Sequence, residues 1–102
     1  MKILFICNQN KNRSKTAEEL FKNKFNTQSA GLYNEKPVSK KQIKWADKIM
    51  VMEDEQRTEL SKIFPELYLK KQIINLNVPD LYNYNQPELI QILNTKIKTL
   101  EF

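Results

Sequence analysis

Short apolar runs alternate along the chain with apolar residues spaced three or four positions apart. Ile3 to Cys7 form a continuously apolar run, which is typical of a parallel strand covered on both faces. Three further runs predict strands at residues 26–30, 49–52 and 73–76. Gly31, the only glycine, follows the second run, and we expect a turn there that needs its conformational freedom.

Helices are predicted from apolar spacing and capping residues in the segments 17–25, 39–46, 54–64 and 85–100. Ser39 and Asn85 each begin a pattern typical of a capping box. Asp54 is the expected N-cap of the third helix, and Pro65 is expected to stop it. Strands that alternate with helices predict a single α/β domain over residues 1–102, with a four-stranded parallel sheet and helices on both faces.

Composition narrows the possible chemistry. Of the 102 residues, 40% are apolar and 28% are charged, which suits one folded domain. One cysteine and no histidine exclude an intramolecular disulfide, a zinc finger and catalytic groups of the Cys-His or Ser-His-Asp kind. The single glycine excludes the glycine-rich loops that bind dinucleotides or nucleoside triphosphates. We expect neither a metal nor a cofactor.

Basic residues outnumber acidic ones by 17 to 12, which gives a net charge of +5. A basic surface attracts phosphate esters, acidic peptides and nucleic acids. The lysines are spread along the chain, however, so charge alone selects no partner, and solubility explains it equally well. The longest apolar run is too short to cross a membrane or to form a signal-peptide core, so we expect a cytoplasmic protein with no membrane partner.

The segment after the first predicted strand carries the candidate chemistry, and it reads Cys7-Asn8-Gln9-Asn10-Lys11-Asn12-Arg13-Ser14. In an open α/β sheet, ligands bind beyond the carboxyl ends of the strands. Backbone N–H groups of such a loop can converge on an anion in front of a helix N-terminus. This field and Arg13 favour the Cys7 thiolate over the thiol. Arg13 offers a fork to phosphoryl oxygens, and Ser14 can donate to the sulfur when it leaves.

A plainer interpretation of the same residues exists. Cys7 can be a small buried apolar residue at a strand end, and Arg13 can be a surface charge. The position of the pattern between an apolar strand and an amphipathic helix favours the chemical interpretation.

At these residues the chain resembles the low-molecular-weight protein tyrosine phosphatase family, whose phosphate loop is Cys-x5-Arg-Ser/Thr in this position. It looks most like a short branch labelled predicted protein tyrosine phosphatase. The resemblance implies a phosphate-binding loop made of Asn8, Gln9, Asn10, Lys11, Asn12, Arg13 and Ser14. Asn10 and Ser14 would hold that loop in shape, and Ser29, in the segment Ser29-Ala30-Gly31, would buttress it. Asp80 is the implied general acid, although the family usually has Asp-Pro where this chain has Pro79-Asp80.

The chain departs from the family pattern at several positions. Gln9 stands where glycine is frequent, Asn12 replaces a second loop cysteine, and Lys15 stands where proline is usual. The chain is also shorter than usual, and the shortened segments normally help to form the walls of the substrate cleft. Tyr82 and Tyr84 are candidates for such a wall, although packing in a surface loop is equally plausible for them.

The implied function is a protein tyrosine phosphatase-like phosphomonoester hydrolase that works without a metal. Cys7 would form a phosphocysteine, Arg13 would bind phosphate, and Asp80 would protonate the leaving oxygen and then activate water. The expected substrate is a phosphotyrosyl protein or a small phosphate ester.

Three alternatives keep the same fold. A phosphate-binding or nucleic-acid-binding module without turnover is possible, although nucleic acid is not favoured. Arsenate reductase chemistry would need an external thiol, because Cys7 is the only cysteine. A phosphocysteine carrier is disfavoured by Arg13, which promotes the hydrolysis that a carrier should avoid.

Overall fold

The computed structural model describes residues 1–100 as four strands and five helices. The strands are β1 (Lys2–Cys7), β2 (Asn26–Gly31), β3 (Lys48–Val51) and β4 (Gln72–Asn75). The helices are α1 (Arg13–Phe21), α2 (Lys40–Trp45), α3 (Asp54–Ile63), α4 (Pro65–Lys70) and α5 (Pro87–Lys98). The strands form one sheet in the order β2-β1-β3-β4, and all neighbouring pairs are parallel. The predicted α/β domain with a four-stranded parallel sheet is confirmed.

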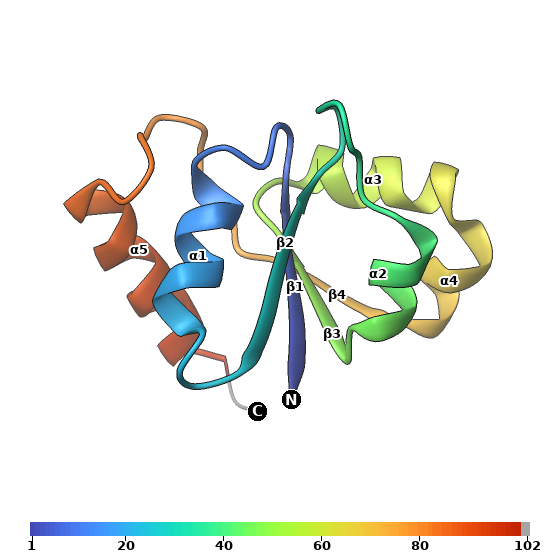
Figure 1. The fold of residues 1–102 in the computed structure, drawn as a ribbon, viewed down its shortest axis with the longest axis horizontal. Coiled ribbons are helices and arrows are strands. Elements are labelled where there is room, and N and C mark those ends of the chain that lie inside the picture. Colours follow the sequence, from blue (N-terminus) through green and yellow to red (C-terminus); the bar gives the residue numbers. More distant parts are fainter. Residues whose placement is uncertain (101–102) are drawn as a thin grey trace.

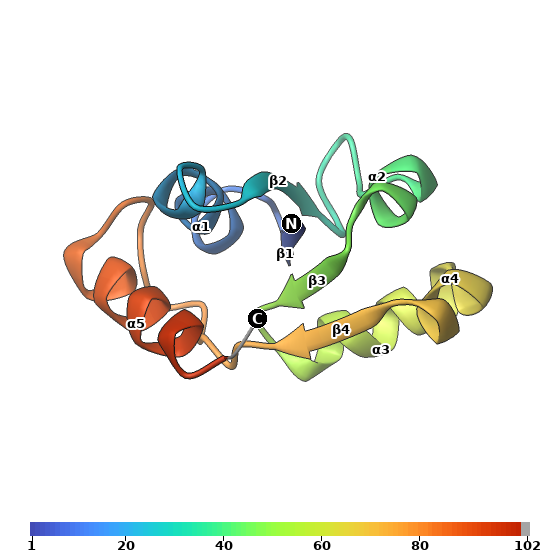
Figure 2. The ribbon, with the colours of Figure 1, turned by 90° about the horizontal axis from the view of Figure 1, so that it is seen from below.

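The sheet separates two groups of helices. α1 and α5 lie on one side of it, and α2, α3 and α4 lie on the other (Figure 1). The view from below shows the same two groups on either side of the central strand β1 (Figure 2). Because the strands are parallel, all their carboxyl ends lie at one edge, the upper edge in Figure 1. This edge carries the loop between β1 and α1.

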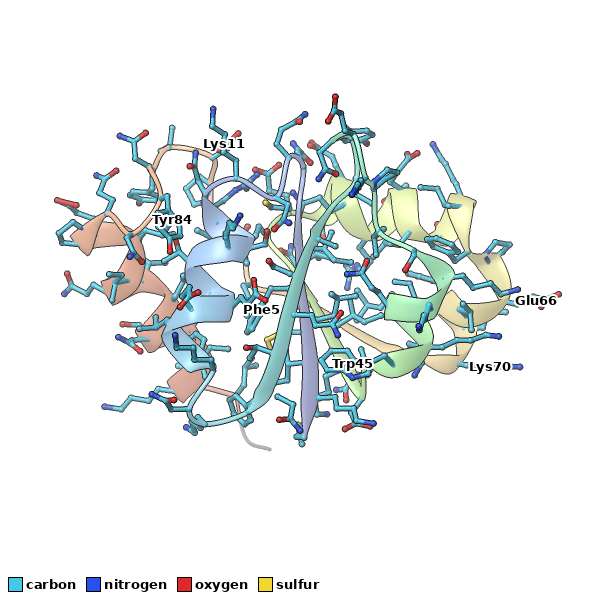
Figure 3. The ribbon with its side chains drawn as sticks, viewed as in Figure 1. Phe5, Lys11, Trp45, Glu66, Lys70 and Tyr84 are labelled. Atoms are coloured by element: carbon cyan, nitrogen blue, oxygen red, sulfur yellow. The ribbon has the colours of Figure 1, made fainter. Side chains whose placement is uncertain are left out.

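Strand β1 explains how the two sides are filled, because its alternate side chains enter two different apolar cores. Ile3, Phe5 and Cys7 belong to the core under α1 and α5, where the ring of Phe5 stacks on Phe21 at 6.0 Å between centroids. Leu4 and Ile6 belong to the core under α2 and α3. Phe5 is drawn between the sheet and α1 in Figure 3. The alternation therefore points Cys7 towards the α1 side of the sheet.

Some helix boundaries follow the sequence prediction and others do not. The predicted capping box at Ser39 is present, since Ser39 Oγ accepts from the Gln42 N–H and the Gln42 side chain accepts from the Ser39 N–H. The N-cap of α3 is Glu53, one residue before the expected Asp54. Pro65 ends α3 but also begins α4, because a first helical residue needs no N–H donor. α4 was not expected from the sequence.

The last helix begins differently from the prediction. Its N-cap is Gln86 rather than Asn85, and no side-chain cap is formed there. Asn85 has a left-handed backbone (φ 58°), and the Gln86 side chain accepts a hydrogen bond from the Asn83 N–H instead. The first helix ends at Phe21, so Phe25 lies beyond it, although Phe25 still packs against the α1–α5 core. Within residues 1–100, no helix is both long and apolar enough to cross a membrane.

Gly31 is required for space and not for an unusual backbone angle. Its φ is not positive, so the expectation of a turn that needs left-handed freedom is wrong. A Cβ at this position would lie 2.5 Å from Asn34 Oδ1 and 2.9 Å from the carbonyl carbon of Gln9. Gly31 thus allows β2 and the loop after it to approach the loop after β1.

Candidate active site

The candidate site lies at the carboxyl edge of the sheet, where β1 passes into α1. Residues 8–14, called here the phosphate loop, follow Cys7, and their last two residues already belong to α1. Asn10 adopts a left-handed backbone with φ 53°, which asparagine tolerates better than most residues. This angle turns the chain back from the strand direction into the helix.

Three side chains within the phosphate loop and its flank form a short polar chain. Cys7 Sγ lies 2.9 Å from Ser14 Oγ, and Ser14 Oγ donates to Asn10 Oδ1 at 2.9 Å. Cys7 and Ser14 are 3% and 0% exposed. A serine hydroxyl has only one hydrogen to donate. Because Ser14 donates it to Asn10, the Ser14 oxygen accepts the hydrogen of the Cys7 thiol. Once the thiol is ionised, the Ser14 hydroxyl can rotate and donate to the thiolate instead. The structure thus brings Cys7, Asn10 and Ser14 together, as the sequence predicts.

Arg13 is buried, with 2% of its side chain exposed. Its Nη1 donates to Glu53 Oε1 at 2.6 Å and to the backbone oxygen of Val78 at 2.8 Å. Its Nε lies 3.8 Å from Asp80 Oδ1. Burial of a cation requires such partners, because an unpaired charge away from water is costly. The alternative in which Arg13 is a simple surface charge does not fit this position.

Gln56 holds the other end of the loop and is 1% exposed. Its Oε1 accepts from the N–H groups of Met52 and Glu53 at 2.6 and 3.1 Å, and its Nε2 donates to Asn8 Oδ1 at 3.1 Å. Sequence reasoning missed both Glu53 and Gln56. One signal could have found Glu53: it follows the strand next to β1, and the carboxyl ends of neighbouring parallel strands meet at one edge.

A cavity of about 220 Å³ opens at this edge. Its lining consists of Cys7, Asn8, Gln9, Lys11, Asn12, Arg13 and Asp80. Within the described part of the chain, the N–H groups of residues 9–12 have no protein acceptor. The cavity therefore brings together a sulfur, a guanidinium and a carboxylate, beside a loop whose amides are left without a protein acceptor. This combination suits a tetrahedral oxyanion. Lys11 stands at the upper edge of the molecule and points outward (Figure 3).

The segment that carries Asp80 is attached to α1. The N–H of Asn85 donates to Oγ1 of the buried Thr16 at 2.9 Å, and Tyr82 packs against the α1–α5 core. Asp80 itself remains 61% exposed. Tyr84 is 45% exposed and lies near the start of α5 (Figure 3). Neither Tyr82 nor Tyr84 lines the cavity, because the first is held by the core and the second faces solvent.

Ser29 is placed differently from the expectation. Its hydroxyl donates to Glu18 Oε1 on α1 at 2.6 Å. The side chain expected to buttress the phosphate loop therefore contacts α1 through Glu18.

The chain has the fold of the low-molecular-weight protein tyrosine phosphatases. No protein-family model matches it, and no curated protein matches its sequence. Among solved structures, it is similar to such a phosphatase from Streptococcus pyogenes, with a TM-score of 0.79 and 17% identity over 96% of this chain and 89% of the other.

Two further structures share the fold with different stated activities. The tyrosine phosphatase Wzb from Escherichia coli K30, solved with sulphate, aligns with a TM-score of 0.71 and 20% identity over 96% of this chain and 94% of its own. The YwlE arginine phosphatase from Geobacillus stearothermophilus aligns with a TM-score of 0.69 and 21% identity over 96% and 93%. At these identities the comparison establishes the fold.

Proposed function

We propose that this protein is a cysteine-dependent phosphomonoester hydrolase of the protein tyrosine phosphatase kind. The observation that carries the proposal is the cavity that Cys7, Arg13 and Asp80 line together with residues of the phosphate loop. Each group has a distinct task in phosphoryl transfer, and a shared fold with phosphatases supports the same interpretation.

The first step transfers the phosphoryl group to the enzyme. The Cys7 thiolate attacks phosphorus, a sulfur–phosphorus bond forms, and the bond from phosphorus to the leaving oxygen breaks. Arg13 and the loop amides bind the phosphoryl oxygens, whose charge must be stabilised in the transition state. Asp80, protonated at this stage, gives its proton to the leaving oxygen.

The second step releases phosphate. Asp80, now a carboxylate, accepts a proton from water as the water oxygen attacks phosphorus. The sulfur–phosphorus bond breaks, and the sulfur leaves as a thiolate that Ser14 Oγ, 2.9 Å away, can stabilise by donation. Asp80 is exposed enough to meet both the leaving group and water.

The proposed substrate is a phosphotyrosyl protein or a small phosphate ester. The structural neighbours include both tyrosine and arginine phosphatases, so the fold alone does not select the phosphorylated group. Apart from Cys7, the cavity lining is polar or charged, which suits recognition of the phosphoryl group more than of an aromatic ring.

The test is a panel of aryl phosphates with good and poor leaving groups, supplemented with phosphotyrosine and phosphoarginine peptides. Cys7→Ser is expected to abolish turnover, because serine is not ionised at neutral pH and is a far weaker nucleophile. Asp80→Asn is expected to slow poor leaving groups by about 10² to 10⁴-fold and good ones much less, because only the former need a proton.

Three results would contradict the proposal. Turnover that survives in Cys7→Ser would show that Cys7 is not the nucleophile. An equal effect of Asp80→Asn on all leaving groups would show that Asp80 is not the general acid. A protein with no turnover of any phosphate, but with salt-dependent RNA binding unaffected by Cys7→Ser, would instead be the binding module.

A further inference from the structure

The guanidinium of Arg13 is fixed along one edge by two acceptors. Nη1 carries two N–H groups, and its two acceptors are Glu53 Oε1 at 2.6 Å and the Val78 backbone oxygen at 2.8 Å. These acceptors come from the segments that follow β3 and β4. The plane of the guanidinium is thereby set by two elements of the sheet rather than by the loop that carries Arg13.

The remaining edge of the guanidinium consists of Nε and Nη2. This edge offers two parallel N–H groups, the geometry that binds two oxygens of one phosphoryl group. Nε already lies 3.8 Å from Asp80 Oδ1, in the cavity that Cys7 lines. Occupation of Nη1 by Glu53 thus leaves the bidentate edge for the ligand.

We propose that Glu53 is a positioning residue for phosphoryl binding, which acts by holding Arg13 with its Nε–Nη2 edge in the cavity. This inference rests on the proposed function of the site. Glu53 does not line the cavity and is not a catalytic residue. It also offsets the positive charge of a side chain that is 2% exposed.

Gln56 extends the same arrangement to the start of the loop. Its Oε1 accepts from the Glu53 N–H at 3.1 Å, and its Nε2 donates to Asn8 Oδ1 at 3.1 Å. The first turn of α3 therefore contacts both Arg13, near the end of the phosphate loop, and Asn8, at its beginning. This double contact fixes the distance between the two ends of the loop from outside it.

A purely electrostatic role and a positioning role of Glu53 predict opposite changes in anion affinity when the Glu53 charge is removed. Glu53→Gln makes the neighbourhood of the cavity more positive, so a purely electrostatic role predicts tighter binding of an anion. A positioning role predicts weaker binding, because the neutral amide holds the guanidinium less firmly and Arg13 leaves its productive orientation. The matched control is Glu55→Gln, which removes an exposed carboxylate from the same helix turn.

The experiment measures how inorganic phosphate protects Cys7 from alkylation by iodoacetamide, together with kcat and KM for an aryl phosphate. For Glu53→Gln, we expect half-protection to need about tenfold more phosphate and KM to rise in parallel, and Glu55→Gln to match the wild type. Glu53→Asp keeps the charge at a shorter reach and is expected to recover part of the loss. A cooperative thermal unfolding transition in each variant confirms that its fold is intact.

The proposal is overturned if Glu53→Gln binds phosphate as tightly as the wild type or more tightly. It is also overturned if Glu53→Asp is no better than Glu53→Gln while both remain folded. Should Glu53→Gln fail to fold, Glu53→Asp against Glu55→Asp decides in the same assay, and equal protection constants overturn the proposal. Phosphate protection needs no turnover, so a wild type that binds phosphate without hydrolysing it refutes the proposed function alone.

Discussion

The two edges of the sheet are made by the same parallel strands but differ in how they treat polar groups. At the carboxyl edge, polar or charged side chains are completely buried, namely Arg13, Ser14, Thr16 and Gln56, and these are the buried polar side chains of the described residues. At the amino edge, the Lys2 N–H donates to Asp47 Oδ2 at 2.9 Å in an exposed contact, and Lys71 Nζ donates to the Ala46 oxygen at 2.6 Å in a partly buried one.

The difference shows where the fold accepts a cost. A buried polar group must replace every bond that water would have made, and each missing bond costs about 1–3 kcal/mol. The carboxyl edge meets that demand with contacts between residues far apart in the chain, such as Arg13 with Val78 and Gln56 with Asn8. The amino edge avoids most of this demand, because its polar side chains stay at least partly in water. Burial of polar groups at one edge only, at a cost in stability, is typical of a functional site.

The largest expected effect in this comparison of the two edges comes from changing Arg13, the buried charged side chain of the carboxyl edge. Arg13→Lys keeps a positive charge but loses the bidentate edge, so we expect kcat/KM for an aryl phosphate to fall about 10³-fold. The matched control at the amino edge is Lys71→Ala, which removes a side chain that donates to the Ala46 oxygen at 2.6 Å. This variant is expected to retain wild-type turnover. Steady-state kinetics on both variants provides the check, and a comparable fall in each would show that the edges do not differ.

The strands and the surroundings of Cys7 were predictable because their signals are local. Ile3 to Cys7 is a continuous apolar run, and its burial on both faces follows from that pattern. Cys7 ends β1, and Arg13 and Ser14 begin α1, so their neighbourhood can be deduced from eight consecutive residues.

The contacts that hold the site together were not predictable in the same way. Glu53 reaches Arg13 only because β1 and β3 are neighbours in a given register, a property of the sheet and not of either segment. Ser29 gives a second example, since the resemblance to a family implied support of the loop, whereas the structure shows its hydroxyl donating to Glu18 on α1. α4 was missed because a proline can both end one helix and begin the next.

A smaller effect is expected from Gly31→Ala at the carboxyl edge. The added Cβ would lie 2.5 Å from Asn34 Oδ1 and 2.9 Å from the carbonyl carbon of Gln9, so one of the two loops must move. We expect a loss of about 1–3 kcal/mol in the free energy of unfolding, and weaker phosphate protection of Cys7 because Gln9 belongs to the phosphate loop. Asn26→Ala, at the exposed start of the same strand, should change stability by less than about 0.5 kcal/mol. Urea unfolding measures both, and equal stabilities would mean that the loops yield without cost.

The smallest expected effect concerns Asp47 at the amino edge, and it tests the difference between the two edges there. The N–H of Lys2 donates to Asp47, and this bond is the main cause that lowers the pKa of Asp47 below its ordinary value of 3.8. A lowered pKa in the folded state stabilises the protein above the unfolded value, and that contribution disappears as the pH falls through the lowered value. Asp47→Asn should therefore have a slightly lower Tm than the wild type near pH 7, and the two should converge as the pH falls through the lowered pKa of Asp47. Because Asp47 is exposed, the difference should shrink with added salt, and turnover should not change. A Tm difference that grows on acidification would contradict this assignment, and a loss of turnover would show that the amino edge also serves the site.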